Sequence, residues 1–162
     1  MRLAEELGLP LVTVIDTPGA ELSVAAEEGA IAGEIARCIA ALTTMTVPTV
    51  AVILGQGCGG GALALLPAQV VVATENAWLS PLPPEGASVI RYRGLDHAPE
   101  MAESQGIGSA ALVESGIVHR VVPEPPDDDA ESLATAVAAT VANELVRLAA
   151  DPGTATPEPD SP

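Results

Sequence analysis

The chain has 162 residues, the length of a single domain, and 48% of them are hydrophobic, which is enough to form a core. Its 22 acidic and 6 basic residues give a formal net charge of −16, which argues against nucleic acid or an anionic membrane surface as a partner. Every basic residue is Arg. This excludes chemistry that needs a lysine amine on this chain: a Schiff base, a Walker A phosphate loop or covalently attached biotin.

The cysteines and histidines predict neither a metal site nor a disulfide framework. Cys38 and Cys58 lie far apart in sequence, as do His97 and His119, so none has the close spacing of zinc ligands. Glu5 stands where a signal peptide would be apolar, and the apolar runs fall short of the roughly 18 residues of a membrane span. We expect a soluble, cytoplasmic protein with no metal on this chain and no membrane partner.

In chain order, the pattern predicts elements that alternate between strand and helix. They are a helix over 2–7 ended by Gly8, a strand over 11–15, a turn over 16–19, a long helix over 24–42, a strand over 50–54, a glycine loop over 55–61, a short helix over 62–66, a strand over 70–74, a further strand around 77–79, a proline-rich loop over 81–86, helical segments up to 115, a strand over 117–122 and an Ala-rich helix over 130–150. This order is typical of β-α-β units with a parallel sheet, and the continuous apolar strands indicate cover on both faces.

The glycine loop is the most informative segment. Five of its seven residues are glycine, and it leads from a strand directly into a helix. Glycines in this number are typical of a backbone that approaches a ligand closely, and the first N–H groups of the helix have no partner within it. The segment therefore predicts an anion or oxyanion site built without side chains.

Two other interpretations of the glycine loop stay open. Gly55-x-Gly57-x-x-Gly60 matches the dinucleotide-binding pattern, and Glu75 follows about 20 residues after the first glycine. Against this interpretation, the following helix would stop before Pro67, which is short for a dinucleotide-binding crossover. The other interpretation is a tight turn that packs a helix closely and binds nothing.

Single polar residues near these segments have structural interpretations as well as catalytic ones. Cys58 could be a thiol nucleophile, but no histidine is near in sequence, which favours a small buried residue. His97 and His119 are expected at the surface or as capping residues. Asp16, at the end of a strand, is expected to accept backbone N–H groups and fix a loop, with catalytic acid as the alternative.

Several of these segments together resemble the carboxyltransferase components of acyl-CoA carboxylases. Ile-Asp-Thr-Pro-Gly-Ala over 15–20 followed by Glu-Glu-Gly over 27–29, and Gly-Gly-Ala-Leu-Ala over 60–64, are similar to two signatures of that family. Pro-Glu-Gly over 84–86, Asp-His-Ala-Pro over 96–99 and the closing strand with Pro-Glu-Pro over 123–125 are similar to the α subunit of bacterial acetyl-CoA carboxylase.

The resemblance implies a fold class and a domain organisation. The fold would be α/β, a crotonase (ClpP/crotonase-like) superhelix of β-β-α turns, N-terminally incomplete because earlier turns of the family's unit have no counterpart here. Residues 1–125 would be the C-terminal part of a carboxyltransferase domain, 126–150 an acidic linker and C-terminal helix, and 151–162 a disordered tail.

The resemblance also implies an activity. Such enzymes move CO2 from carboxybiotin, carried on a separate carrier protein, to an acyl-CoA, and acetyl-CoA would give malonyl-CoA for fatty acid synthesis. Backbone N–H groups stabilise the negative charge on the enolate and on biotin. The implied catalytic residues are Gly60, Gly61 and Ala62, and the implied substrate-binding residues are Gly19, Ala20, Gly57, Gly59, Glu85 and Gly86.

The resemblance implies partners: a β-type carboxyltransferase subunit, the biotin carboxyl carrier protein, an acyl-CoA and an oligomer. A biotin-linked or malonate-type decarboxylase subunit is the nearest alternative. A dinucleotide-binding domain and a non-catalytic assembly fragment are alternatives of other classes.

Overall fold

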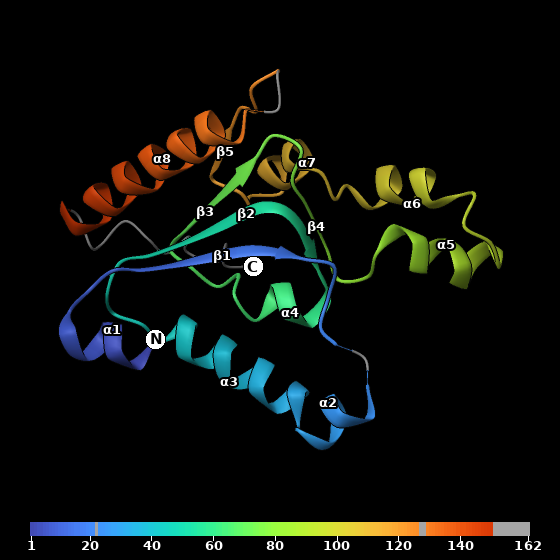
Figure 1. Cartoon of the computed structure of the whole chain (residues 1–162), viewed down its shortest axis with the longest axis horizontal. Helices are drawn as coiled ribbons and strands as arrows, with labels where there is room; N and C mark the ends of the chain where they lie inside the picture. Colours follow the sequence, from blue (N-terminus) through green and yellow to red (C-terminus); the bar gives the residue numbers. More distant parts are fainter. Residues whose placement is uncertain (22, 127–128, 151–162) are drawn as a thin grey trace, which may run out of the picture.

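The computed structural model describes residues 1–21, 23–126 and 129–150, so the expected tail over 151–162 lies outside the described residues. The strands are β1 (Leu11–Thr17), β2 (Thr49–Cys58), β3 (Val70–Thr74), β4 (Trp78–Ser80) and β5 (Arg120–Val122). The helices are α1 (Arg2–Leu7), α2 (Val24–Glu28), α3 (Ile31–Thr43), α4 (Gly59–Leu63), α5 (Pro84–Tyr92), α6 (Ala98–Gln105), α7 (Ser109–Glu114) and α8 (Ala130–Ala150). The alternation predicted from the sequence is confirmed (Figure 1).

The five strands form one parallel sheet in the order β1-β2-β3-β5, with β4 also paired to β2. Strand β2 is long enough to have two neighbours on the same side. Its first half pairs with β3 up to Ile53, and its last residues, 56–58, pair with β4. The sheet is therefore extended at the end where the glycines lie.

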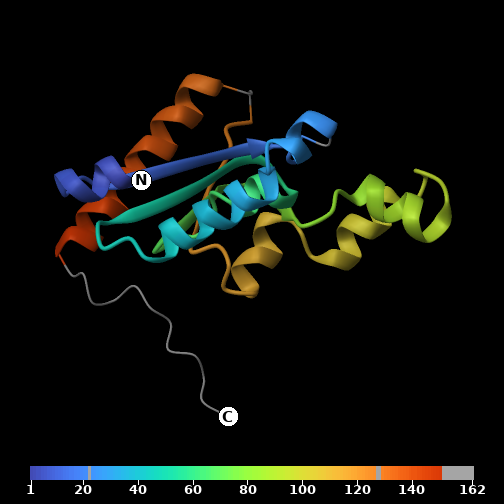
Figure 2. The ribbon, with the colours of Figure 1, turned by 90° about the horizontal axis from the view of Figure 1, so that it is seen from below.

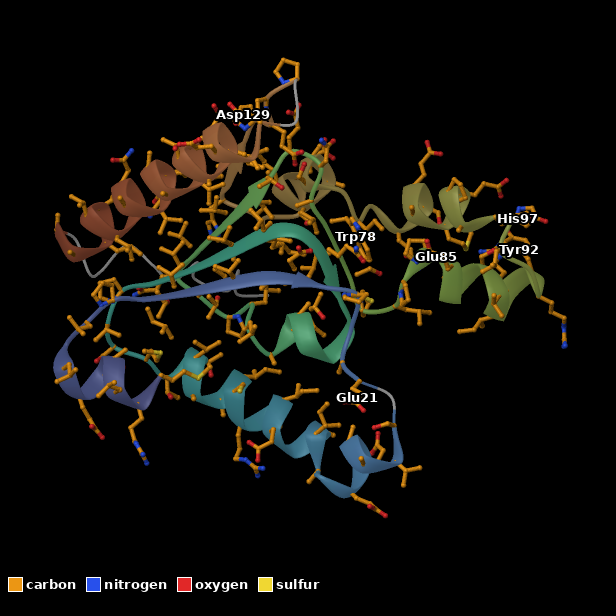
Figure 3. All side chains as sticks on the ribbon, viewed as in Figure 1. Glu21, Trp78, Glu85, Tyr92, His97 and Asp129 are labelled. Carbon is orange, nitrogen blue, oxygen red and sulfur yellow. The ribbon has the colours of Figure 1, made fainter. Side chains whose placement is uncertain are left out.

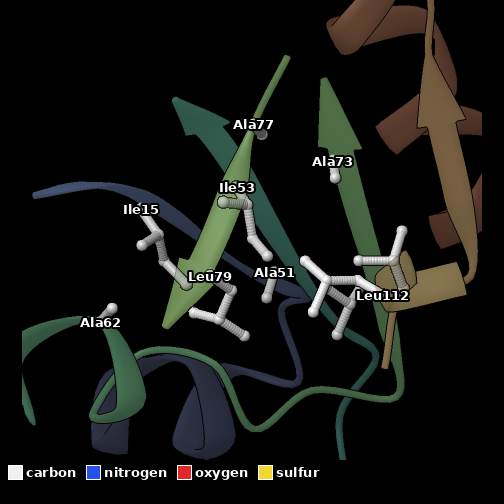
Figure 4. Close-up of a cluster of buried hydrophobic side chains, with 10 residues drawn as sticks. Ile15, Ala51, Ile53, Ala62, Ala73, Ala77, Leu79 and Leu112 are labelled. Carbon is white, nitrogen blue, oxygen red and sulfur yellow. The ribbon is translucent and has the colours of Figure 1, made fainter. Parts of the chain in front are cut away.

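Two apolar clusters cover the two faces of the central strands. On one face, α8 packs Leu148 against valines of β2, β3 and β5, namely Val50, Val52, Val70, Val72 and Val122. On the other face, α4 and α7 contribute Ala62 and Leu112 to a second cluster with Ile53, Ala73 and Leu79 (Figure 4). Both faces of β2 and β3 are buried, as their continuous apolar sequences predict.

Strand β1 is an edge strand and is covered less completely. Its register places Val12 opposite Val50 and Val14 opposite Val52, so these two side chains share the face on which α8 packs. Helix α8 does not extend over β1, and Val12 and Val14 are 38% and 57% exposed. An open edge with exposed valines is a surface that sheet proteins usually cover.

The structure corrects four predicted boundaries. The helix predicted over 24–42 is two helices, because the chain breaks at Gly29 and at Ala30, whose φ is 57°. The glycine loop predicted over 55–61 continues as strand through Cys58, since residues 56–58 pair with β4, and the helix then begins at Gly59.

The other two corrections concern the later part of the chain. The loop predicted over 81–86 is helical from Pro84, where the fixed φ of proline suits the first helical turn. The last strand starts at Arg120 instead of 117, although the N–H of His119 already donates to the Val71 carbonyl at 2.8 Å.

Helix α8 is long and apolar enough to cross a membrane by length and composition alone. This differs from the expectation that no segment reaches that length. One such helix is weak evidence of a membrane span, and α8 packs Leu148 with several partly buried apolar residues on the sheet.

Candidate active site

The segments that follow β1 and β2 meet at the carboxyl edge of the sheet. The two strands are parallel neighbours, with Thr17 opposite Gly57, so their C-terminal ends lie side by side. This edge is where parallel α/β proteins bind ligands. The residues after β1 are Gly19 and Ala20, and those after β2 open helix α4.

The backbone around Gly61 is packed directly against the segment after β1. A β-carbon on Gly61 would lie 3.3 Å from the Ala20 nitrogen and 3.4 Å from the Gly19 carbonyl carbon. Gly59 has a φ of +61°, and a β-carbon there would lie 3.9 Å from the α-carbon of Gly19. Gly19 and Ala20 were expected beside the glycine loop, and the structure brings them together with Gly59 and Gly61.

The N–H groups at the start of α4 include two that the helix itself leaves free. Gly60 and Gly61 are the second and third helical residues, so their N–H groups have no carbonyl four residues earlier in the helix. Ala62 is the fourth helical residue, and the carbonyl four residues before it is that of Cys58, the N-cap, so its N–H group is the first that the helical pattern can pair. Ala62 is also fully buried in the core. The helical positions therefore favour Gly60 and Gly61 over Ala62 as donors to a ligand.

Helix α3 packs against α4 beside this junction. A β-carbon on Gly60 would come within 2.8 Å of the Ile35 Cδ1 atom, so the absence of a side chain lets α4 approach α3 closely. Two neighbouring glycines thus have different neighbours: Gly60 faces an aliphatic side chain, and Gly61 faces the backbone of residues 19–20.

The Asp16 carboxylate contacts the backbone of β2 at Gly55 and Gln56. Its Oδ1 atom accepts the Gln56 N–H at 3.0 Å and lies where a β-carbon on Gly55 would clash, at 2.9 Å. This confirms the predicted structural interpretation, in which Asp16 accepts a backbone N–H group. Gly55 is needed for the close approach of that carboxylate.

Gly57 lies within the strand, with its α-carbon facing β4. A β-carbon there would be 2.9 Å from Leu79 Cδ1 and 3.0 Å from the Trp78 carbonyl oxygen. The close packing of β2 against β4 therefore explains why position 57 is glycine. The dinucleotide interpretation needs a tight turn at Gly55 and Gly57, whereas both residues are part of β2.

Glu85 and Gly86 are on helix α5, apart from the contact between Gly61 and Ala20. Exposed Glu85 lines a hollow of about 410 Å³ together with Trp78 and Glu103. A β-carbon on Gly86 would lie nearest to Leu82 and Pro83, in the segment before α5. Trp78 and Glu103 were not predicted, and sequence spacing gave no signal for them because they come from β4 and α6. Trp78 and Glu85 are labelled in Figure 3.

Cys58 is not arranged as a nucleophile. Its side chain is 2% exposed, and burial, with a smaller effect of the Glu85 charge, raises the pKa of the thiol above its ordinary value. A raised pKa favours the unreactive thiol over the thiolate. The expectation of a small buried cysteine is confirmed.

The histidines have structural roles. His119 accepts the Val71 N–H on its Nδ1 atom at 3.0 Å and so extends the ladder of β3. His97 contacts Glu100 at 3.0 Å and stacks on Tyr92. Among the described residues, no group of three or more His, Cys, Asp or Glu side chains could hold a metal ion.

A larger cavity of about 660 Å³ lies between α4, β4 and α7. It is lined mainly by aliphatic side chains such as Leu63, Leu66 and Ile107, and it contains none of the predicted site residues. We place the candidate site at the junction of residues 19–20 with 59–61, because that is where free backbone donors and close-packed glycines coincide. Such donors can stabilise negative charge on a ligand oxygen.

The chain matches a protein family described as acetyl co-enzyme A carboxylase carboxyltransferase-like over residues 1–156. It is 59% identical over 127 residues to the probable biotin-dependent acyl-coenzyme A carboxylase beta3 subunit of Mycobacterium tuberculosis, which is 78% of this chain and 26% of that protein. It is 40% identical over 153 residues to the acetyl-coenzyme A carboxylase carboxyl transferase subunit alpha of Deinococcus radiodurans, 93% of this chain and 48% of that protein. The chain thus spans about a quarter to a half of these relatives.

Solved structures give the fold. Transcarboxylase 12S aligns with a TM-score of 0.76 at 23% identity, over 98% of this chain and 30% of that chain. A Pseudomonas malonate decarboxylase hetero-tetramer aligns with a TM-score of 0.75 at 16% identity, over 91% of this chain and 62% of that chain. The expected crotonase fold is confirmed by these likenesses.

Proposed function

The chain belongs to the acetyl-CoA carboxylase carboxyltransferase-like family, and from this premise we propose that it forms the biotin-facing half of a carboxyltransferase centre. Within the complete enzyme it takes part in moving CO2 from carboxybiotin to an acyl-CoA. The observation that carries the proposal is the junction of Gly61 with residues 19–20, where the start of α4 provides backbone N–H groups as donors.

The first N–H groups of α4 suit a ligand that presents a carbonyl oxygen, as the ring of biotin does. Any residue larger than glycine at position 61 would place a β-carbon against the Ala20 nitrogen. Glycine at position 61 therefore lets α4 pack against residues 19–20 and holds its first N–H groups beside them. When bound there, carboxybiotin would supply the CO2 that is transferred.

In this proposal the residues of this chain bind the ligand and stabilise the negative charge that develops on it. The N–H groups of Gly60 and Gly61 donate to the ligand oxygen on which negative charge develops, and Gly19 and Ala20 pack beside these donors. Ala62 stays a predicted donor. One lost donor in a comparable oxyanion site lowers the rate by about 100- to 1000-fold.

Acetyl-CoA is the acyl-CoA that we propose, with malonyl-CoA for fatty acid synthesis as the product. Relatives named as acetyl-coenzyme A carboxylase carboxyl transferase alpha subunits support this choice. The alternative is a decarboxylase subunit, which the likeness to a malonate decarboxylase keeps open. The separate carrier protein, a cytoplasmic location and the absence of a metal on this chain belong to the same proposal.

A β-type carboxyltransferase subunit is the partner that we propose for catalysis. The open edge of β1, with Val12 and Val14 exposed, offers it an apolar surface. Glu85 and Gly86, on α5, would lie toward the substrate.

The test is reconstitution. The chain is combined with a β-type subunit, biotin carboxylase, carrier protein, ATP and labelled bicarbonate, and label in each acyl-CoA is counted. We expect label in malonyl-CoA that requires this chain. Label found only in the carboxylation product of propionyl-CoA would show that propionyl-CoA, and not acetyl-CoA, is the substrate. Transfer that proceeds equally without the chain would refute the proposal.

A further inference from the structure

The cavity of about 660 Å³ between α4, β4 and α7 is separate from the junction of residues 19–20 with 59–61. It lies on the face of the sheet that α7 covers, opposite α8 (Figure 2). Its floor belongs to the core, since the side chains of Leu79, Ile107 and Leu112 are buried. Its volume is in the range of small-molecule sites, about 300 to 1,000 Å³.

The walls of this cavity are aliphatic and uncharged. The aliphatic lining continues from the floor to the mouth, where Leu63 and Ile117 are exposed. None of the described residues that line the cavity carries a charge. A charged group that entered it would lose hydration without gaining an ion pair, and the chain's net charge of −16 repels anions further. The cavity therefore suits an uncharged ligand.

Three polar side chains line the cavity, and two of them are available to a ligand. Ser80 is buried, and its hydroxyl donates to the Leu82 carbonyl and accepts the Leu82 N–H. Exposed Ser115 donates to the Leu112 carbonyl at 3.1 Å, which leaves lone pairs on its oxygen. Exposed Gln105 has an amide that both donates and accepts. A hydroxyl group on the ligand suits this pair.

The composition of the lining favours a small molecule over a protein as the occupant. Protein interfaces are enriched in aromatic residues, Met and Arg. The described lining has none of these and consists of Leu, Ile, Ala, Pro and Gly beside the three polar residues. The lining also comes from several separate segments, namely α4, β4, α7 and residues 105–107. Such walls can surround a chain-like molecule, whereas a flat apolar face would suit another helix.

We propose that this cavity binds an uncharged molecule that has an aliphatic chain and a hydroxyl group. The chain lies on Leu79 and Leu112, and the hydroxyl group reaches Ser115 and Gln105. Burial of apolar surface provides the affinity, so binding strengthens with chain length. The ligand also contacts Leu63 of α4, the helix whose first N–H groups are the proposed donors. The binding itself does not rest on the proposed function, because it involves neither biotin nor acyl-CoA.

The test is isothermal titration calorimetry of the 162-residue chain with 1-octanol and with octanoate, which have equal chain lengths and differ in charge. We expect saturable binding of octanol, and octanoate should bind at least about tenfold more weakly. 1-Hexanol lacks two methylene groups and should also bind about tenfold more weakly than 1-octanol. The absence of saturable octanol binding overturns the proposal, as does equal binding of octanoate or of hexanol.

A matched pair of variants on α7 tests whether the ligand is in the cavity. Ala111→Phe extends a ring from a lining position and should weaken octanol binding at least about tenfold by occupying the space. Ala110→Phe, at the adjacent exposed alanine that does not line the cavity, should leave binding unchanged. Circular dichroism should show the same helix content in both variants. Equal effects of the two variants would place octanol elsewhere and overturn the proposal.

A second pair of variants tests the charge preference without filling the cavity. Ile117 is exposed at the mouth, so the ammonium group of Ile117→Lys can stay in water. It should strengthen octanoate binding about threefold. Val113→Lys, at an exposed valine outside the lining, makes the same change in net charge and should not strengthen it. Equal gains in both variants overturn the assigned mouth. Octanol binding that weakens as the chain concentration rises would show that a second copy fills the cavity, which also overturns the proposal.

Discussion

The α-carbon of Gly61 faces the amide of Ala20, and a β-carbon placed on it would lie 3.3 Å from the Ala20 nitrogen. The contact joins two segments that are far apart in sequence and that meet because β1 and β2 are parallel neighbours. Backbone atoms cannot move aside as a flexible side-chain end can. Substitution of Gly61 therefore has to displace the wall of the candidate site itself.

The first prediction is that Gly61→Val abolishes carboxyl transfer in the complete enzyme. The branched side chain would meet the backbone of residues 19–20 and displace the donor N–H groups, so we expect a loss of at least about 100-fold. The measurement is malonyl-CoA formation, with biotin carboxylation by the upstream enzyme unchanged. Gly94→Ala is the matched control, because nothing lies within 4 Å of a β-carbon there. Near-normal transfer by Gly61→Val would rule out this role.

The second prediction compares two neighbouring glycines. Gly60→Ala places its methyl group near the Ile35 Cδ1 atom, the end of a side chain that can rotate. Gly61→Ala meets only backbone. We expect Gly61→Ala to reduce kcat more than Gly60→Ala does, while Gly60→Ala lowers the melting temperature more. Steady-state kinetics and thermal unfolding of both variants test this, and the reverse order of the kinetic effects would contradict the assigned geometry.

The third prediction concerns Asp16, which accepts the Gln56 N–H. Asp16→Ala leaves that N–H without its partner and should loosen the end of β2, at a cost of about 1 kcal/mol. Asp16→Asn keeps an acceptor oxygen and should recover most of the stability and of the carboxyl transfer. If Asn were as damaging as Ala, the negative charge, and not the hydrogen bond, would be the important property of Asp16.

The fold was largely predictable because the strands have strong and simple signals. The valines of β2 and β3 form continuous apolar runs, and glycines or prolines mark most of the connections. The predicted helix over 24–42 was wrong because hydrophobic periodicity carries across Gly29 and Ala30 without revealing the backbone turn there. The strand at Gly55–Cys58 was missed because glycine has low strand propensity, and pairing with β4 overrides that preference.

The candidate site was predictable only in part. The meeting of residues 19–20 with Gly61 follows from strand order, which a βαβ pattern indicates. The hollow beside Glu85 was not predictable, because Trp78 and Glu103 reach it from β4 and α6, and no spacing rule links those elements. Resemblance to a family supplied the roles of the glycines, which composition alone could not assign.

The fourth prediction is a loss of stability in acid through Glu144. This side chain is 7% exposed on α8 and bonds Arg120 of β5 and Arg147 at 2.8 Å each. Burial acts to raise the pKa of the Glu144 carboxyl, but the hydrogen bonds and charges of Arg147 and Arg120 outweigh it and hold the pKa below its ordinary value. A lowered pKa means that the carboxylate contributes stability above about pH 4.5, and that this contribution is lost as the pH falls through the folded-state pKa.

The variant Glu144→Gln tests the direction of this pH dependence of stability. It should lower the free energy of unfolding at pH 7 by about 1 kcal/mol, a modest value because both arginines are half exposed and screened by water. The difference from the unmodified chain should shrink in acid. Urea unfolding at a series of pH values measures it, with Glu114→Gln, an exposed glutamate of α7, as the control. A difference that grows as the pH falls would contradict the assigned ion pairs.

The last prediction concerns the open edge of the sheet. Val12 and Val14 lie on the α8 side of β1, beyond the reach of α8, and among the residues that the structure describes β1 is paired along one edge only. Leu7 and Leu9 nearby are 60% and 52% exposed. We expect the isolated chain to bind a hydrophobic dye at this surface and to show no malonyl-CoA decarboxylation with free biotin derivatives. Adding a β-type subunit should lower dye binding and give activity, because the apolar surface becomes covered. Val14→Asp should block that association and leave the circular dichroism of the chain unchanged, whereas Val113→Asp, at a valine of α7 that is 43% exposed, should not affect it. A chain that is active by itself, or a Val14→Asp variant that associates normally, would show that this edge is not where the partner binds.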